Sequence, residues 1–448
     1  MTTSTDNAPA QWWLQCQRAA AARFAALPMP GRQDPNWRFA GAPDADLASY
    51  QPAAGLGEAE REQALAASDN AFATAGGAVF GNEQLLSFTA ADDALAKQGV
   101  IFEPLTVALA RHPDLLQKHF MSQPVALGSE KFAALHRANC NHGILLYVPA
   151  KVRITLPLTA WHWLAGDRQA VFPHTLIIAE AGSEVTFADF YRSLGTAPGL
   201  AVSVTDLLVG AGARVTYLGC QDWNEQVRSC HLNAISVGRD AGAKTLNCNL
   251  GGASARVESH SRLTGVGARS EMLGLSVGHG AQEFDQRTRQ DHRAPRTWSD
   301  LLYKNILNHR AKAVFAGLIK VAPGAPQTDA YQTNRNLLLS DEAEADSMPG
   351  LEIANDDVKC SHGATTGQID PEALFYLLQR GIPRHEADYL LAVGFTEEVL
   401  ARFGHDPINT RLRAMIADKF RRGKRRQVGP ADDAAAGSAN ARHPQHPV

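Results

Sequence analysis

The sequence predicts a mainly β protein, a parallel β-helix flanked by helical N-terminal and C-terminal regions. Three observations support this prediction: short β-rich runs between residues 144 and 365, a glycine-bearing turn that recurs within them, and strong helix signals on both sides. We expect four segments: a helical region over 1–125, a β-helix core over 126–368, a helical domain over 369–427 and a disordered tail over 428–448.

The composition is that of an ordinary globular protein. The 448 residues are 45% hydrophobic and 20% charged, with a net charge of −3, so neither a nucleic acid nor a membrane surface is favoured as a partner. The six cysteines are scattered without a CxxC pair. The N-terminus MTTSTDNAPAQWWLQ lacks the pattern of a secretory signal, and no stretch approaches membrane-spanning length. We therefore expect a cytoplasmic protein with reduced cysteines.

The N-terminal region favours helices separated by prolines. The alanine-rich runs over 16–27 and 57–68 have high helix propensity. Within 103–120, leucines recur among polar residues on both sides of Pro113. This pattern predicts two short amphipathic helices.

Recurring turns support the β-helix prediction. The stretches AGSEVTF, AGARVTY and AGAKTLN place Gly182, Gly212 and Gly242 at intervals of thirty residues, and looser copies follow at 266–272 and 279–285. A fixed period is typical of repeat architectures, and each unit has too little apolar surface to fold alone, so stacked units must form the core. A β-propeller lacks its Trp-Asp or kelch landmarks here. A β-sandwich with coincidental turns is the remaining alternative.

Helical signals return after the repeats. Asp370, Pro371 and Glu372 form a strong helix start, with an N-cap, a proline at the first helical position and an acid in the first turn. Gly381 and Gly394 predict helix ends. The pattern predicts four helices, over 371–380, 384–393, 397–403 and 407–420.

The stretch DDVKCSHGATTGQID, residues 356–370, holds the main candidate metal ligands. A strand alternates its side chains between two faces, so Asp356, Cys360 and His362 share one face. A thiolate beside an imidazole suits zinc, iron or an iron–sulfur cluster, but a closed site needs about four ligands. The residues therefore predict part of a site that another coil, a ligand or another subunit completes. Packing of a cysteine beside a surface histidine is the alternative.

Other reactive residues give weaker signals. His136 and His142 flank Cys140 and resemble a metal cluster by residue type, but their spacing matches no zinc pattern. The basic run over 419–426 is expected to be a solvated helix end. The sequence contains no P-loop, no GxGxxG after a strand and no GxSxG. The cysteines of the repeat region are expected in its core: Cys220, Cys230 and Cys248.

Two long runs, over 304–353 and 357–395, resemble the SufB/SufD family of the SUF iron–sulfur cluster assembly system. The stretch RQDPNWRFA at 32–40 is a looser match to an N-terminal segment of that family. The motif CSHGATTGQ at 360–368 is similar to the SufD branch, whereas the SufB branch carries His-Glu-Ala-Thr at this point. The resemblance implies a right-handed parallel β-helix between helical regions.

The resemblance also implies a function. It predicts a non-catalytic scaffold subunit that pairs with a SufB-like paralogue through the β-helix and binds a SufC-like ATPase through helices within 371–420. Cys360 and His362 match the SufD residues assigned to a transient iron or iron–sulfur cluster shared with the SufB partner. Reduced flavin is associated with such complexes, but no residue here is assigned to it.

Two alternatives remain open at this point. The chain could be a purely structural partner of SufB without cluster ligands of its own. It could also be a stand-alone β-helix enzyme acting on polysaccharides, with Asp285 and Asp291 as the acids. The sequence does not say whether iron, sulfur or the assembled cluster contacts this chain.

Overall fold

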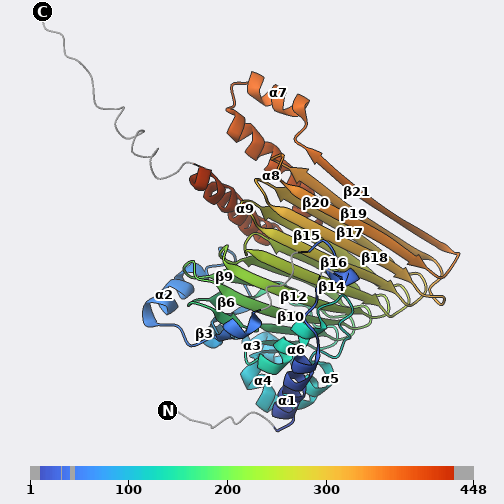
Figure 1. The fold of residues 1–448 in the computed structure, drawn as a ribbon. Helices are drawn as coiled ribbons and strands as arrows, with labels where there is room; N and C mark the ends of the chain where they lie inside the picture. Colours follow the sequence, from blue (N-terminus) through green and yellow to red (C-terminus); the bar gives the residue numbers. More distant parts are fainter. Residues whose placement is uncertain (1–10, 32, 41–45, 428–448) are drawn as a thin grey trace, which may run out of the picture.

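The computed structural model describes residues 11–427 apart from residue 32 and residues 41–45. Its core is the expected parallel β-helix, in which the chain winds between two sheets (Figure 1). Helical regions precede and follow the β-helix, also as expected. The predicted disordered tail over 428–448 lies outside the described residues. Among the described helices, none is long and apolar enough to cross a membrane.

Successive strands of the β-helix alternate between two sheets, called sheet A and sheet B. Within each sheet the strands pair in parallel, except for β4 with β5 and β2 with β3 near the N-terminal end. The path of sheet A is β20 (Glu344–Ile353), β18 (Lys312–Val321), β16 (Glu283–His292), β14 (Ser254–Leu263), β12 (Val227–Val237), β10 (Gly199–Val209), β8 (His174–Ala179), β5 (Gly143–Val148) and β4 (Ile101–Pro104), with β7 (Gln169–Val171) and β1 (Gln51–Pro52) beside it. The path of sheet B is β21 (Val358–Gln368), β19 (Thr328–Leu338), β17 (Trp298–Leu307), β15 (Arg269–Gly278), β13 (Gly242–Asn249), β11 (Arg214–Asp222), β9 (Glu184–Ser193), β6 (Leu158–Leu164), β2 (Gly76–Gly81) and β3 (Gln84–Thr89).

A column of left-handed residues forms one corner of the coils. Each member has a positive φ angle, and its backbone N–H donates to the carbonyl one coil further along the chain. The hydrogen bonds at this corner therefore run from coil to coil, in the same direction as those of the sheets. The column consists of Lys151, Gly182, Gly212, Asp240, Gly267, Arg296 and Gln327.

The thirty-residue period holds for only part of the β-helix. Arg214 pairs with Glu184, thirty residues earlier, but with Gly242, twenty-eight residues later. Gly242 therefore begins β13, while Asp240 takes the left-handed place that Gly212 has one coil earlier. The prediction that Gly242 is a third copy of the turn was wrong, because the coil is shorter and the corner residue is not a glycine.

The N-terminal region contains helices but also four strands, which the sequence analysis did not predict. Strands β1 to β4 lie between residues 51 and 104 and join the two sheets. Apolar side chains of β2 to β4, such as Phe80 and Phe102, extend the core of the β-helix. The two short helices expected around Pro113 are present. The helices and 3-10 turns of this region are α1 (Gln11–Ala26), η1 (Pro35–Trp37), η2 (Leu47–Ser49), α2 (Glu58–Ala67), α3 (Asp93–Lys97), α4 (Leu105–Arg111), α5 (Pro113–His119) and α6 (Glu130–Asn139).

Apolar side chains are buried in three places. The interior of the β-helix holds residues such as Phe187 and Val215. On the outer face of sheet A, Trp13 of α1 and Phe132 of α6 pack against the strands. On the outer face of sheet B, the C-terminal helices pack in the same way, for example through Leu400. The helical regions are thus attached to opposite faces of the β-helix.

The C-terminal helices are α7 (Pro371–Gln379), α8 (Arg384–Phe403) and α9 (Asp406–Gln427). Helix α8 continues through Gly394, where the sequence predicted an end, and includes the helix predicted over 397–403. The hydroxyl of Thr396 donates to the carbonyl of Val393 at 2.7 Å instead of capping a new helix. Ala392 and Leu400 are fully buried against sheet B. This continuous apolar stripe outweighs the cost of about 1 kcal/mol for one internal glycine.

Two glycine substitutions test the corner column. Gly212→Ala places a side chain at a φ of +67° and should lower the free energy of unfolding by about 1–2 kcal/mol. Gly242→Ala should change it by less than about 1 kcal/mol, because this glycine has no positive φ and a Cβ there meets no atom within 4 Å. Urea unfolding measures both. Equal losses in the two variants would contradict the assigned corner and favour a strict thirty-residue repeat.

Candidate functional site

The last coil of the β-helix is open. Strands β20 and β21 lie at the ends of their sheets, and within the described part of the chain no strand pairs with their outer edges (Figure 1). The two strands are 10 and 11 residues long, so they present long rows of backbone N–H and C=O groups. Such edges are ready to pair with another chain.

The candidate ligands Cys360 and His362 lie on β21. Cys360 is in register with Ala330, and His362 with Gln332, and both of these β19 residues are buried. The two side chains therefore share the inward face of the last coil, as the alternation predicted. The thiol of Cys360 is half-buried, whereas the His362 side chain is exposed. Asp356 precedes the strand and is exposed, so it does not share this face.

The surroundings of Cys360 keep its thiol protonated. Partial burial raises the pKa of this thiol, and the nearby carboxylate of Asp329 raises it further. A thiol with a raised pKa is a weak nucleophile and a weak ligand until a cation approaches it. The surroundings of Cys360 in this chain therefore favour the neutral thiol over the thiolate.

Apolar side chains lie beside the candidate ligands at the open end. Leu351 and Ile353 of β20 are 38% and 42% exposed, although they are in register with Ile319 and Val321, which are buried. Side chains in an inward register are normally covered by the next coil, which is missing here. The open end therefore combines two polar ligands with uncovered apolar surface. Sequence reasoning missed these apolar residues, although their two-residue spacing matches a strand with one inward face.

The structure also brings together part of the weaker cysteine–histidine cluster. The side chains of His136 and Cys140 meet that of His174, and the ligand atoms of these three residues all lie within 4.8 Å of one another. His142 is not part of this group, and its ring packs beside that of Phe80 with 5.5 Å between the two ring centroids. The i, i+4 spacing of His136 and Cys140 at the end of a helix could have indicated this pair. Nothing in the sequence indicated His174.

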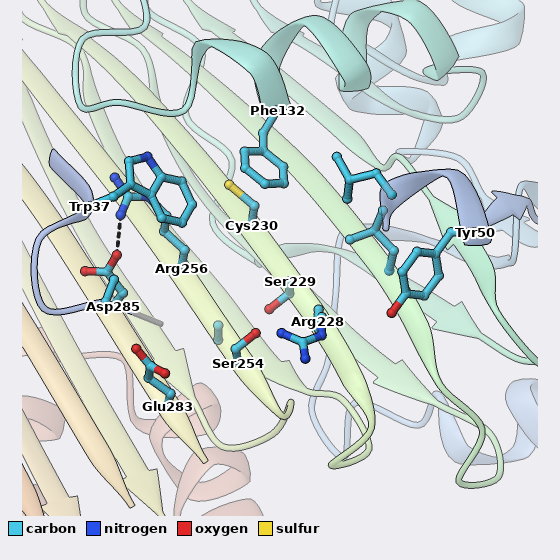
Figure 2. Close-up of a pocket in the computed structure, with 14 residues that line it drawn as sticks. Trp37, Tyr50, Phe132, Arg228, Ser229, Cys230, Ser254, Arg256, Glu283 and Asp285 are labelled. Atoms are coloured by element: carbon cyan, nitrogen blue, oxygen red, sulfur yellow. Dashed lines mark hydrogen bonds and ion pairs between the residues drawn. The ribbon is translucent and has the colours of Figure 1, made fainter. Parts of the chain in front are cut away.

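A cavity lies on the outer face of sheet A, beside the N-terminal segment that contains Trp37 (Figure 2). The guanidinium of Arg256 lies 3.8 Å from the centroid of the Trp37 ring and pairs with Asp285 and Glu258. Arg256 also donates to the carbonyl of Asn36 at 3.0 Å. These contacts anchor the N-terminal segment to the β-helix.

The two acids considered for a polysaccharide-acting enzyme are engaged in ion pairs. Asp285 pairs with Arg256, and Asp291 with Arg293 at 2.7 Å. Burial raises the pKa of Asp291, but hydrogen bonds from His260 and Arg293 outweigh it and hold that pKa well below the usual range. A carboxyl group held ionised in this way is a poor general acid, so these residues give no support to that alternative.

Comparison with known proteins gives consistent matches. The family model for the SUF system FeS cluster assembly, SufBD core domain, matches residues 162–395. The iron–sulfur cluster assembly protein SufD of Bacillus subtilis (strain 168) is 30% identical over 329 residues, which are 73% of this chain and 75% of that protein. SufBD family proteins of Staphylococcus haemolyticus and Staphylococcus aureus (strain USA300) are each 28% identical over 304 residues. Those residues are 68% of this chain but 65%, less than two thirds, of the staphylococcal proteins.

The parallel β-helix and the match to the core-domain model define a β-helix protein of iron–sulfur cluster assembly. The chain belongs to the SufBD family of the SUF system, because the core-domain match covers more than half of its length. The family expected from the sequence is thus confirmed.

Thiol labelling tests the exposure of the candidate ligand. All six cysteines carry free thiols, and Cys16 and Cys360 are the two that are not buried. The folded chain should therefore react rapidly with an aromatic disulfide reagent at two thiols, and at all six after unfolding. Cys360→Ser should remove one of the two reactive thiols, whereas Cys248→Ser should remove neither. A folded chain that loses no reactive thiol on Cys360→Ser would show that the open end is covered.

Proposed function

We propose that this chain is a non-catalytic scaffold subunit of a SUF complex. In this role it pairs with a SufB-type paralogue, binds a SufC-type ATPase and contributes ligands to a nascent iron–sulfur cluster. The observation that supports the proposal most directly is the open last coil, which presents Cys360 and His362 beside two uncovered strand edges. The similarity to SufD of Bacillus subtilis supports the same role.

The paralogue is proposed to dock on the open coil. The edges of β20 and β21 can continue each sheet through backbone hydrogen bonds to strands of the partner. Leu351 and Ile353 would then be covered by the partner, as their counterparts one coil earlier are covered within this chain. Burying apolar surface contributes about 25 cal/mol per Å², so covering these side chains would favour association of the two chains.

The nascent cluster or its iron is the cargo of this interface. Cys360 and His362 supply two ligands on one face, and a closed iron or zinc site needs about four. The partner is proposed to supply the rest. A site divided between two chains can open when the chains move apart, which allows a scaffold to release what it has assembled. Whether iron, sulfide or the complete cluster contacts these residues is a question for the experiment below.

The ATPase is proposed to dock on α7. The carboxylate of Asp370 accepts a hydrogen bond from the backbone N–H of Glu372 and caps this helix. None of the nine residues of α7, all of them described, is buried, and Phe375 and Tyr376 are 62% and 57% exposed. Helices α8 and α9 are packed on sheet B. Of the helices within 371–420, α7 is therefore proposed to contact the ATPase, and α8 is proposed to support α7. No residue is assigned to reduced flavin.

A matched pair of variants tests the ligand role. His362→Ala should lower the iron and sulfide content of the co-expressed complex by roughly tenfold, because losing even an outer partner of a metal ligand weakens binding by about 10–100-fold and losing the ligand itself costs at least as much. Ser361→Ala, on the opposite face of the same strand, should leave the content unchanged. Iron, sulfide and subunit ratios are measured on the purified complex.

Two outcomes of that experiment would contradict the ligand role. If His362→Ala and Cys360→Ser complexes both carried normal cluster, the chain would be a purely structural partner. If His362→Ala prevented the subunits from associating, the residue would act in docking instead.

The ATPase contact is tested on α7. Phe375→Ala should weaken binding of the ATPase by about 2 kcal/mol, or about thirtyfold, if this exposed ring is a central anchor of the interface. Glu372→Ala, at the exposed start of the same helix, should change binding by less than about threefold. Titration calorimetry with the purified ATPase measures both affinities. Equal binding by wild type and Phe375→Ala would place the contact elsewhere.

A further inference from the structure

A second group of metal-ligating side chains lies at the N-terminal end of the β-helix, between α6 and the outer face of sheet A. His136 belongs to α6, Cys140 caps the C-terminal end of that helix, and His174 is the first residue of β8. All three residues have an exposed fraction of 0%. The group is separate from Cys360 and His362, which lie on the last coil.

The spacing of the ligand atoms suits one metal ion. Nε2 of His136 and Nδ1 of His174 are 3.2 Å apart. Two imidazole nitrogens bound to a tetrahedral zinc ion at about 2.0–2.1 Å are about 3.4 Å apart, so these rings need to move very little. The sulfur of Cys140 lies within 4.8 Å of one ring nitrogen of each histidine, compared with about 3.6 Å in a tetrahedral site, and a side-chain adjustment closes that gap.

The outer nitrogen of each histidine faces the kind of group that metal-bound histidines use. Nδ1 of His136 lies 2.8 Å from the carbonyl oxygen of Val202, so it donates there and turns Nε2 toward the other ligands. Nε2 of His174 lies 3.5 Å from a carboxylate oxygen of Asp206. A carbonyl or carboxylate at the outer nitrogen fixes the tautomer and ring orientation of a ligating histidine.

Hydrogen bonds among the described residues satisfy this group only in part. Nε2 of His174 makes no hydrogen bond within the described part of the chain, although it is fully buried. The sulfur of Cys140 donates a weak hydrogen bond to the carbonyl oxygen of His142 at 3.7 Å. A cation bound to this sulfur and to Nδ1 of His174 would give the sulfur a strong partner and would make the N–H at Nε2 of His174 a stronger donor toward Asp206.

We propose that His136, Cys140 and His174 bind a divalent transition-metal ion of the zinc and iron(II) class, with Asp206 orienting His174 from outside. Two imidazoles and one thiolate form a borderline-soft ligand set, which selects these ions over magnesium and calcium. On binding, the ion displaces the proton of the Cys140 thiol, and that proton leaves to solvent. Burial raises the pKa of Asp206 to about 7, and the charge of a bound ion would favour its ionised form. The thiolate and that carboxylate would then offset the two positive charges of the ion.

The protonation states of the histidines agree with this geometry. Burial lowers the pKa of His136 to about 4 and lowers that of His174 well below its usual value, so both rings are neutral near pH 7, as ligation requires. Burial raises the pKa of Cys140, which opposes deprotonation of the free thiol. The charge of a bound ion reverses that preference, as it does for other coordinated thiols.

A close backbone approach holds the ligands together. A Cβ at Gly143 would lie only 1.9 Å from the carbonyl oxygen of His174, so only a glycine allows the segment after Cys140 to pass so near β8. The ring of Phe120 lies 4.2 Å from that of His174, between centroids, and shields the group from water. An ion here would therefore tie α6 to the first coil of the β-helix.

Cobalt(II) titration of the full-length chain, after removal of metals with a chelator, tests the proposal. The wild type should bind one equivalent with a thiolate-to-cobalt charge-transfer band, and zinc(II) should displace the cobalt and raise the melting temperature. Cys140→Ser should lose the band, and His136→Gln should weaken binding by roughly tenfold or more. Cys360→Ser and Cys230→Ser should retain the full signal, since neither residue belongs to the group.

Two results would overturn the proposal. One is a folded wild-type chain that takes up no cobalt and gains no stability from zinc, a test that does not depend on any variant. The other is a charge-transfer band that is lost in Cys360→Ser but kept in Cys140→Ser, which would assign the ion to the open end. Circular dichroism of each variant distinguishes lost ligation from lost folding.

Discussion

The structure depends on hydrogen bonding between the backbones of successive coils. Strands β10 and β12, for example, pair over eleven consecutive positions, and the left-handed corner residues add a hydrogen bond between coils at each turn. Each coil contacts chiefly the coils before and after it, so stability accumulates by nearest-neighbour contacts. Side chains determine which face of a strand is buried, but the backbone ladder determines where each strand lies. The positions of the candidate ligands on strands, Cys360, His362 and His174, follow from that register.

Because each coil is held by backbone hydrogen bonds to its neighbours, the first and last coils have one neighbour each, and the two ends of the β-helix solve this differently. At the N-terminal end, the antiparallel strands β3 and β4 are the outermost strands of the two sheets, and helices cover the outer face of sheet A. At the C-terminal end, the described chain leaves the last coil and continues into α7 without adding a further strand. The thiol and the imidazole on β21 therefore face the interior of the β-helix at the end where no further coil covers it. The incomplete ligand set of the proposed site would be a direct result of ending the repeat without a further strand.

The sequence predicted the architecture well because its signals are local. The glycine-bearing turns, the proline after Asp370 and the alternation around Cys360 all depend on neighbours in the chain. The errors arose where tertiary contacts decide: Asp240 takes a left-handed corner where a glycine was expected, and α8 continues through Gly394 because its apolar face is buried. His174 could not be predicted to lie beside His136 for the same reason, because only the folding of β8 under α6 brings them together.

The unequal ends have one more consequence, which concerns the size of the assembly. A solenoid with two exposed sheet edges of similar length could stack end to end without limit and form a fibre. Here the outermost strands at the N-terminal end are only four and six residues long, whereas those at the other end have ten and eleven. Growth by edge pairing would therefore be favoured in one direction, and it would stop once two such ends met face to face. In the proposed complex, the geometry that leaves the last coil open would also limit this pairing to two subunits.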